Sequence, residues 1–288
     1  MQDYVIYSDS ACDVSEETLK KWQVEYSNLY FNFTGEEHLY ENFDIPFNEF
    51  YDRMRKGAVA KTSAINSDTY VKAFRPILEA GKDILVLVFS SGLSITCQSA
   101  AMAADELKAE FPDRKIYVVD SLCASAGQGL FVYLTVKKRE EGASLEEARD
   151  YALSIRPHLC HWFTVDDLVY LKRGGRVSGA AAFVGGILDI RPVLHVDDEG
   201  HLINMSKVRG RRKSIMALAE KYDALALDKA GGTVFISHAD CEEDAKTLAA
   251  ILKRRYGQDV DLITEIGPVI GAHSGPGTLA LFFLGEKR

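Results

Sequence analysis

The stretch DILVLVFSSGLSITCQSA, residues 83–100, joins an apolar run to a cluster of hydroxyls and then to a helix-like segment. Residues 83–89 are apolar on both faces, which is typical of a central strand in a parallel sheet. The spacing from Ser94 onward predicts a helix, with Ser94 at or near its N-terminus. In open parallel sheets, ligands bind beyond the carboxyl ends of the strands. The stretch therefore predicts an α/β fold and a ligand close to these serines.

The same junction of an apolar strand and small polar residues recurs at YSDS (7–10), VVDS (118–121) and ISHAD (236–240). Strand-like and helix-like segments alternate along the chain, which indicates α/β architecture. With 288 residues, the chain exceeds the roughly 250 residues that one hydrophobic core usually organises. We therefore expect two α/β domains, residues 1–158 with a mostly parallel Rossmann-like sheet and residues 159–288 with a mixed sheet, and a ligand cleft between them.

Several local signals predict the ends of individual elements. Residues 24–33 are rich in aromatic and β-branched side chains and are expected to form one extended segment. A helix over 67–81 is expected to be capped by Ser67 and closed by Gly81. A hairpin is expected to turn at Glu199-Gly200, and residues 267–283 are expected to form a strand and a Gly-Pro-Gly turn.

The composition narrows the class of protein. The net charge of −8 argues against nucleic-acid binding. No apolar run approaches the roughly 18 residues of a membrane-spanning helix, and the N-terminal residues do not resemble a secretory signal. The five cysteines are scattered and form no CxxC, which suits reduced thiols. We therefore expect a cytoplasmic protein without membrane insertion.

Three sites carry hydroxyl or histidine side chains that could contact a ligand. Ser94 at or near a helix N-terminus could hold a carboxylate or phosphate, although its position alone favours a simple N-cap. Thr62 and Ser63 form a second hydroxyl pair ahead of a helix, where such residues also serve ordinary turns. His273 could donate to an anion or act as an acid or base, but a lone histidine is more often structural.

Two basic segments stand out against the acidic whole: YLKRGGRVSG (170–179), with Arg173 and Arg176, and KVRGRRKS (207–214). They could contact an oxyanion or an acidic partner, or form solvated faces. The segment GAAAFVGGIL (179–188) is compatible with a core helix or with a wall for an apolar ligand. HLCH (158–161) lacks a second ligand group for zinc, and the chain contains no GxGxxG, Walker, GxSxG or HExxH motif. We expect no metal, no cofactor and no catalytic residue.

Six segments in order resemble the DegV family of bacterial fatty-acid-binding proteins, from about residue 3 to residue 284. They are SDSACDV, KTSAINS, SSGLSITCQSA, DLVYLKRGGRVSG, KVRG and GAHSGPGTLALFF. The resemblance implies two α/β domains that bury a long-chain fatty acid, and a protein that is not itself an enzyme. In some family members a separate fatty-acid kinase phosphorylates the bound carboxylate, so such a kinase is an expected partner. The oligomeric state stays open.

The resemblance also implies roles for individual residues. Thr62 and Ser94 would bind the carboxylate, supported by Ser63 and the amide of Ile95, and His273 would approach the same headgroup. The family's usual glycine is replaced by Ile95, whose side chain is expected to narrow the space over the helix N-terminus.

For the remainder of the ligand, the resemblance places Arg173 and Arg176 near the cleft, serving the headgroup or the kinase surface. The acyl tail would pass Phe183, Ile187 and Leu188. The residues alone leave two rivals open: a small-molecule hydrolase or phosphotransferase that uses the serine-rich cleft with His273, and a protein whose basic segments dock an acidic partner.

Overall fold

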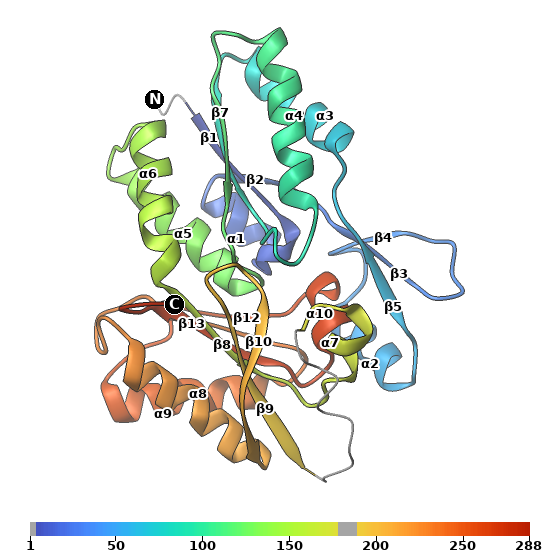
Figure 1. The fold of residues 1–288 in the computed structure, drawn as a ribbon, viewed down its shortest axis with the longest axis vertical. Coiled ribbons are helices and arrows are strands. Elements are labelled where there is room, and N and C mark those ends of the chain that lie inside the picture. The colour runs from blue at the N-terminus through green and yellow to red at the C-terminus, as the bar shows by residue number, and fades with distance from the viewer. Residues whose placement is uncertain (1–3, 178–188) are drawn as a thin grey trace.

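The computed structural model describes residues 4–177 and 189–288 and organises them around three β-sheets (Figure 1). The N-terminal sheet has the order β2-β1-β6-β7, and all its neighbouring strands are parallel. Its strands are β1 (Tyr4–Asp9), β2 (Val24–Ser27), β6 (Asp83–Val88) and β7 (Ile116–Asp120). The predicted central strand is thus confirmed as β6, which is buried on both faces.

Helices cover both faces of this sheet because alternate side chains of β1 and β6 point to opposite sides. Val5 and Tyr7 pack with α3 and α4, whereas Tyr4 and Ile6 pack with α5 and α6. The helices and short 3-10 turns of this half are η1 (Ser10–Cys12), α1 (Glu16–Lys21), α3 (Ser67–Glu79), α4 (Thr96–Glu110), α5 (Ala126–Glu140), α6 (Leu145–Ile155) and η2 (Arg156–His158).

The C-terminal sheet has the order β10-β9-β8-β13-β11-β12. Its pairings are antiparallel except that of β11 with β12, so the predicted mixed sheet is confirmed. The predicted hairpin is β9–β10, with Gly200 at φ +80° in its turn. The elements are β8 (Leu159–Thr164), β9 (Ile190–Val196), β10 (Leu202–Arg209), α8 (Arg211–Leu225), β11 (Phe235–His238), α9 (Glu242–Tyr256), β12 (Leu262–Glu265) and β13 (Leu279–Leu284).

One helix joins the two sheets. Helices α8 and α9 pack on one face of the C-terminal sheet, and α5 packs on the other. Since α5 also covers the N-terminal sheet, one core continues from Ile6 and Leu87 through Leu130 to Phe163 and Phe282. The protein therefore has two α/β domains that share a packed helix, and the boundary between residues 158 and 159 stays a prediction.

A small antiparallel sheet, β4-β3-β5, extends from the N-terminal half. It consists of β3 (Tyr30–Phe33), β4 (Tyr40–Glu41) and β5 (Ala60–Ser63), and α2 (Phe47–Arg55) packs against it through an aromatic cluster. The expectation of one extended segment over 24–33 is wrong. The chain leaves the N-terminal sheet after Ser27 and enters the small sheet at Tyr30.

Two further expectations are corrected. Asn66, not Ser67, caps α3, because its side chain accepts a hydrogen bond from the amide of Thr69. The region around His273 forms a helix, α10 (Pro268–Ser274), before the Gly-Pro-Gly turn and β13. The prolyl ring at the first helical position explains where α10 begins, and Gly275, whose φ of +82° and ψ of 165° favour glycine, ends the helix.

Within residues 4–177 and 189–288, no helix combines the length and the apolar character needed to cross a membrane. All five cysteines are free thiols.

Candidate functional site

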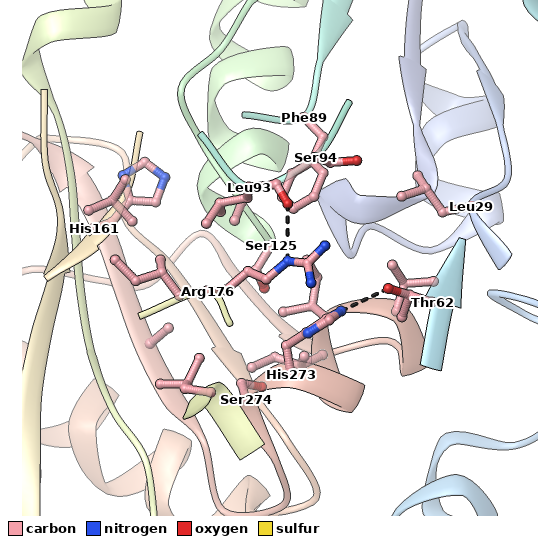
Figure 2. A pocket seen from close by; sticks show the side chains of 18 of the residues that line it. Leu29, Thr62, Phe89, Leu93, Ser94, Ser125, His161, Arg176, His273 and Ser274 are labelled. Atoms are coloured by element: carbon pink, nitrogen blue, oxygen red, sulfur yellow. Dashed lines mark hydrogen bonds between the residues drawn. The ribbon is translucent and has the colours of Figure 1, made fainter. Parts of the chain in front are cut away.

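A cavity of about 540 Å³ lies between the two domains and the small sheet (Figure 2). This volume falls in the usual range of small-molecule sites, roughly 300–1,000 Å³. Its walls are mainly apolar and come from both halves of the chain. The apolar lining is Leu29, Ala64, Phe89, Leu93, Ile95, Ala124, Phe163, Leu171, Val196, Leu202, Ile266, Val269, Ile270, Ala280 and Phe282.

One corner of the cavity is polar, and Thr62 and His273 form its centre. Thr62 Oγ1 and His273 Nε2 lie 2.8 Å apart, and Figure 2 shows the contact as a dashed line. Thr62 lies on β5, opposite Phe31 of β3, and His273 lies in the last turn of α10. The helix α10 packs against the small sheet, so two segments more than 200 residues apart meet here.

The imidazole of His273 is neutral at pH 7. Burial is the main cause that lowers its pKa to about 4, and the nearby charge of Arg176 lowers it further. The ring also contacts the α7 helix (Val169–Gly174) at its last residue: a Cβ on Gly174 would lie 2.2 Å from His273 Nδ1. Glycine at position 174 is therefore needed for the ring to occupy this place.

Ser94 lies in the loop between β6 and α4. Its Oγ accepts a hydrogen bond from the amide of Thr96 at 3.2 Å and lies 2.8 Å from Thr96 Oγ1. The predicted position near the helix N-terminus is confirmed, but Ser94 is not the N-cap, because Ile95 occupies that position and Ser94 precedes it. Ser94 also lines the cavity. Ile95 is 66% exposed and also lines the cavity, and the narrowing of the space over the helix N-terminus by its side chain stays a prediction.

Arg176 connects the two domains across the cavity. Its Nε donates to the carbonyl of Leu93 at 3.3 Å, and its guanidinium also donates to the carbonyl of Gly174 (Figure 2). Arg173 is exposed on α7, with its guanidinium carbon 5.9 Å from the centre of the Tyr170 ring, and does not belong to the cavity lining. Both arginines are exposed, but only Arg176 lines the cavity.

The structure brings together six of the residues singled out in the sequence: Thr62, Ser63, Ser94, Ile95, Arg176 and His273 all line the cavity. Arg173 lies outside it. Phe183, Ile187 and Leu188 lie outside the described residues, so their assignment to the acyl-chain wall stays a prediction.

Several lining residues escaped the sequence analysis. His161 and Phe163 project from β8, and Ser125 precedes α5. The one signal that could have identified His161 is its place in LCHWFT, a buried strand where an ionisable side chain is costly. The other histidine of HLCH, His158, lies within 3.1 Å of the carbonyl oxygens of Gly285 and Glu286 and does not line the cavity. Among the described residues no group of three or more side chains could hold a metal ion.

The fold and the cavity define a class of two-domain α/β proteins that enclose an apolar space with one polar corner. The family model that matches, over residues 4–286, is that of an uncharacterised protein of the DegV family. This chain belongs to the DegV family.

The relatives are similar along their whole length. A DegV domain-containing protein of Clostridium perfringens is 40% identical over 100% of this chain and 99% of its own. A fatty-acid-binding DegV-family protein of Thermus thermophilus has a similar structure, with a TM-score of 0.87 and 30% sequence identity. The match covers 99% of this chain and 100% of that protein's chain. A stearic acid-binding protein of Eubacterium ventriosum has a TM-score of 0.88 and 28% identity, over 98% of both chains.

Proposed function

We propose that this protein binds a long-chain fatty acid, with the carboxylate at the polar corner and the acyl tail against the apolar walls. The observation that carries the proposal is that two hydroxyls (Thr62 and Ser94), the neutral imidazole of His273 and the guanidinium of Arg176 line one mainly apolar cavity. The fatty acids bound by the relatives from T. thermophilus and E. ventriosum support the same ligand class.

The chemistry of a fatty acid matches both parts of the cavity. A buried carboxylate is costly unless donors satisfy its oxygens, and Thr62, Ser94 and Arg176 supply such donors. Each buried methylene contributes about 0.8 kcal/mol, so a long tail supplies most of the affinity. Ser63 and the amide of Ile95 lie on the same lining and would support the headgroup.

The first test is mass spectrometry of an organic extract of the purified protein, beside an unrelated control from the same host. The double variant Thr62→Ala with Ser94→Ala should keep its fold and bind the acid at least about tenfold more weakly, because two hydrogen bonds to a charged group are lost. The matched control is Ser206→Ala with Thr247→Ala, which removes two exposed hydroxyls outside the cavity. Full lipid content in the cavity variant would overturn the headgroup assignment.

A second candidate is a small-molecule hydrolase or phosphotransferase. The distance of 2.8 Å between Thr62 Oγ1 and His273 Nε2 suits a hydroxyl activated by a base. Against it, no described residue forms a hydrogen bond with His273 Nδ1 to orient the ring as a general base requires. Substrate turnover that disappears in His273→Ala would favour this candidate, whereas weaker lipid retention alone favours binding.

We also propose that the bound acid is presented to a separate kinase in the cytoplasm. Lys172 and Arg173 support this role, since both are exposed on α7, the helix that contributes Leu171 to the cavity.

A further inference from the structure

The first turn of α10 is held by side chains from the other half of the chain. Its own N-cap is Gly267, which has no side chain to accept a hydrogen bond from the amides at the helix start. Asp13 Oδ1 accepts from the amide of Gly267 at 2.9 Å, and Asn42 Oδ1 accepts from the amide of Val269 at 3.1 Å. Two side chains that lie 254 and 227 positions away in the sequence therefore cap α10.

Glycine at position 267 allows both side chains to approach the helix. A Cβ there would lie 2.5 Å from Asn42 Nδ2 and 3.0 Å from Asp13 Oδ1. Asn42 is 0% exposed and Asp13 is 3% exposed, and Asn42 Nδ2 also donates to the carbonyl of Ser10 at 3.3 Å. Because the contacts are buried, removing either acceptor leaves a backbone amide without a partner and without access to water.

A third side chain holds the chain just before α10. The hydroxyl of Tyr51, on α2, donates to the carbonyl of Ile266 at 2.6 Å, and the side chain is fully buried. The same hydroxyl lies against α10 itself, because a Cβ on Gly271 would be 2.4 Å from Tyr51 Oη. We call Asp13, Asn42 and Tyr51 the α10 anchor.

The helix transmits the position of its first turn to the polar corner of the cavity. Val269 and His273 both line the cavity and are four positions apart, which is about one helical turn. Figure 2 shows the imidazole of His273 reaching Thr62 Oγ1, 2.8 Å from Nε2. None of the three residues of the α10 anchor belongs to the described lining of the cavity. A shift of the first turn would therefore move the imidazole without changing any residue that contacts the ligand.

We propose that Asp13, Asn42 and Tyr51 are positioning residues for fatty-acid binding, which hold His273 in the place where the carboxylate is recognised. The proposal rests on the fatty-acid binding proposed above and adds residues outside the cavity to it. Hydrogen bonds to a carboxylate depend steeply on distance and angle, whereas the apolar contacts of the tail are non-directional. Loss of the α10 anchor should therefore weaken recognition of the headgroup and leave binding of the tail almost unchanged.

The first experiment compares two ligands with the same tail, octadecanoic acid and octadecan-1-ol. Their dissociation constants are measured for the full chain and for two variants. The unmodified protein should bind the acid at least about tenfold more tightly than the alcohol, because hydrogen bonds to a charged group are stronger. Asn42→Ala should weaken the acid about tenfold and Tyr51→Phe about fivefold, while the alcohol changes by less than about twofold. An unchanged ratio of the two constants, or an equal loss of both ligands, would overturn the proposal.

The second experiment tests rescue by a conservative substitution. Asp13→Ala removes the acceptor for the amide of Gly267, so the acid-to-alcohol preference should fall about tenfold. Asp13→Asn keeps that acceptor and should retain the preference within about twofold. A role that depends only on the charge of Asp13 predicts the same loss in both variants and would contradict the proposal.

The control is Gln258→Ala. Gln258 is 3% exposed, donates to the carbonyl of Gly232 at 2.7 Å and does not line the cavity. Its loss should lower stability and leave the acid-to-alcohol preference unchanged. A preference that falls equally in Gln258→Ala would show that it follows general destabilisation, and would overturn the positioning role. If an alanine variant of the α10 anchor does not fold, Tyr51→Phe decides, because it removes a single hydroxyl and keeps the ring.

The two proposals fail in different ways. If the unmodified protein prefers the acid and every variant of the α10 anchor keeps that preference, only the positioning role is wrong. If the unmodified protein binds acid and alcohol equally, or binds neither, carboxylate recognition itself is wrong and the positioning role falls with it.

Discussion

At the scale of single residues, Arg173 and Arg176 are only three positions apart in the sequence but differ in their surroundings. Both belong to one basic segment, and the sequence offered no reason to distinguish them. Arg176 reaches the carbonyl of Leu93 across the cavity, and its charge lowers the pKa of His273. Arg173 lies on α7 outside the cavity lining, although both arginines are exposed. A carboxylate in the cavity would lie near the charge of Arg176, whereas a docking protein would contact Arg173.

This difference predicts distinct effects of charge reversal. Arg173→Glu should leave the bound fatty acid unchanged and abolish its ATP-dependent phosphorylation, because a surface charge fixes partner choice. Arg176→Glu should reduce the bound acid as well, since it places a carboxylate beside the headgroup. Lipid content is measured by mass spectrometry, and acyl phosphate formation is followed in an extract of the source cells. Normal phosphorylation of the acid on Arg173→Glu would exclude this docking role.

At the scale of elements, the N-terminus of α3 depends on one side chain. Asn66 Oδ1 accepts from the amide of Thr69 at 2.8 Å, while Ser67 already lies inside the helix. Removing an N-cap typically costs about 1 kcal/mol. Asn66→Ala should therefore lower the free energy of unfolding by roughly that amount, and Asn66→Asp should restore most of it. Ser67→Ala is the matched control and should change stability by less than about 0.5 kcal/mol. Chemical denaturation measures all three, and equal losses at both positions would contradict the assignment.

The elements also show why the sequence predicted some features and not others. The strand β6 and the β9–β10 hairpin were predictable because apolar runs and Gly200 are local signals. The division of residues 24–33 between two sheets was not, since both strands carry the same residue types and only tertiary pairing separates them. The helix α10 was missed because its glycines and proline suggest a turn, whereas packing against the small sheet stabilises it.

The candidate site also has features that the sequence predicted and features that it did not. Thr62, Ser94 and His273 were predictable because they stand in recognisable motifs of polar and small residues. The contact of Thr62 with His273 depends on α10 packing beside β5, a contact between distant segments that no local pattern encodes. His161 was missed because the sequence of strand β8 predicts only a buried strand.

At the scale of the whole molecule, a buried carboxyl links the two domains. Asp13, which follows η1, accepts a hydrogen bond from the amide of Gly267 at 2.9 Å, where α10 begins. Its other oxygen lies 2.6 Å from Ser125 Oγ, and Ser125 Oγ lies 2.9 Å from Ser237 Oγ of β11. Burial raises the pKa of Asp13 to about 8, so the carboxyl is protonated at neutral pH. This contact fixes the start of the helix that carries His273.

The raised pKa of Asp13 predicts how stability depends on pH. Between its ordinary value of 3.8 and about 8, the folded protein keeps a proton that the unfolded chain releases. The free energy of unfolding should therefore fall as the pH rises through this window, by up to about 1.4 kcal/mol per pH unit for one proton. Asp13→Asn keeps an acceptor for Gly267 and a donor for Ser125 but cannot ionise, so its stability should fall less steeply. Urea denaturation between pH 5 and pH 8 measures the difference.

A second buried carboxyl, Asp9, also titrates in this range, because burial raises its pKa to about 6. Asp9 contributes equally to the pH dependence of stability in the unmodified protein and in Asp13→Asn, so its contribution cancels in the comparison. The exposed control Asp259→Asn should follow the unmodified protein, and parallel curves for Asp13→Asn would show that this carboxyl does not carry the proton.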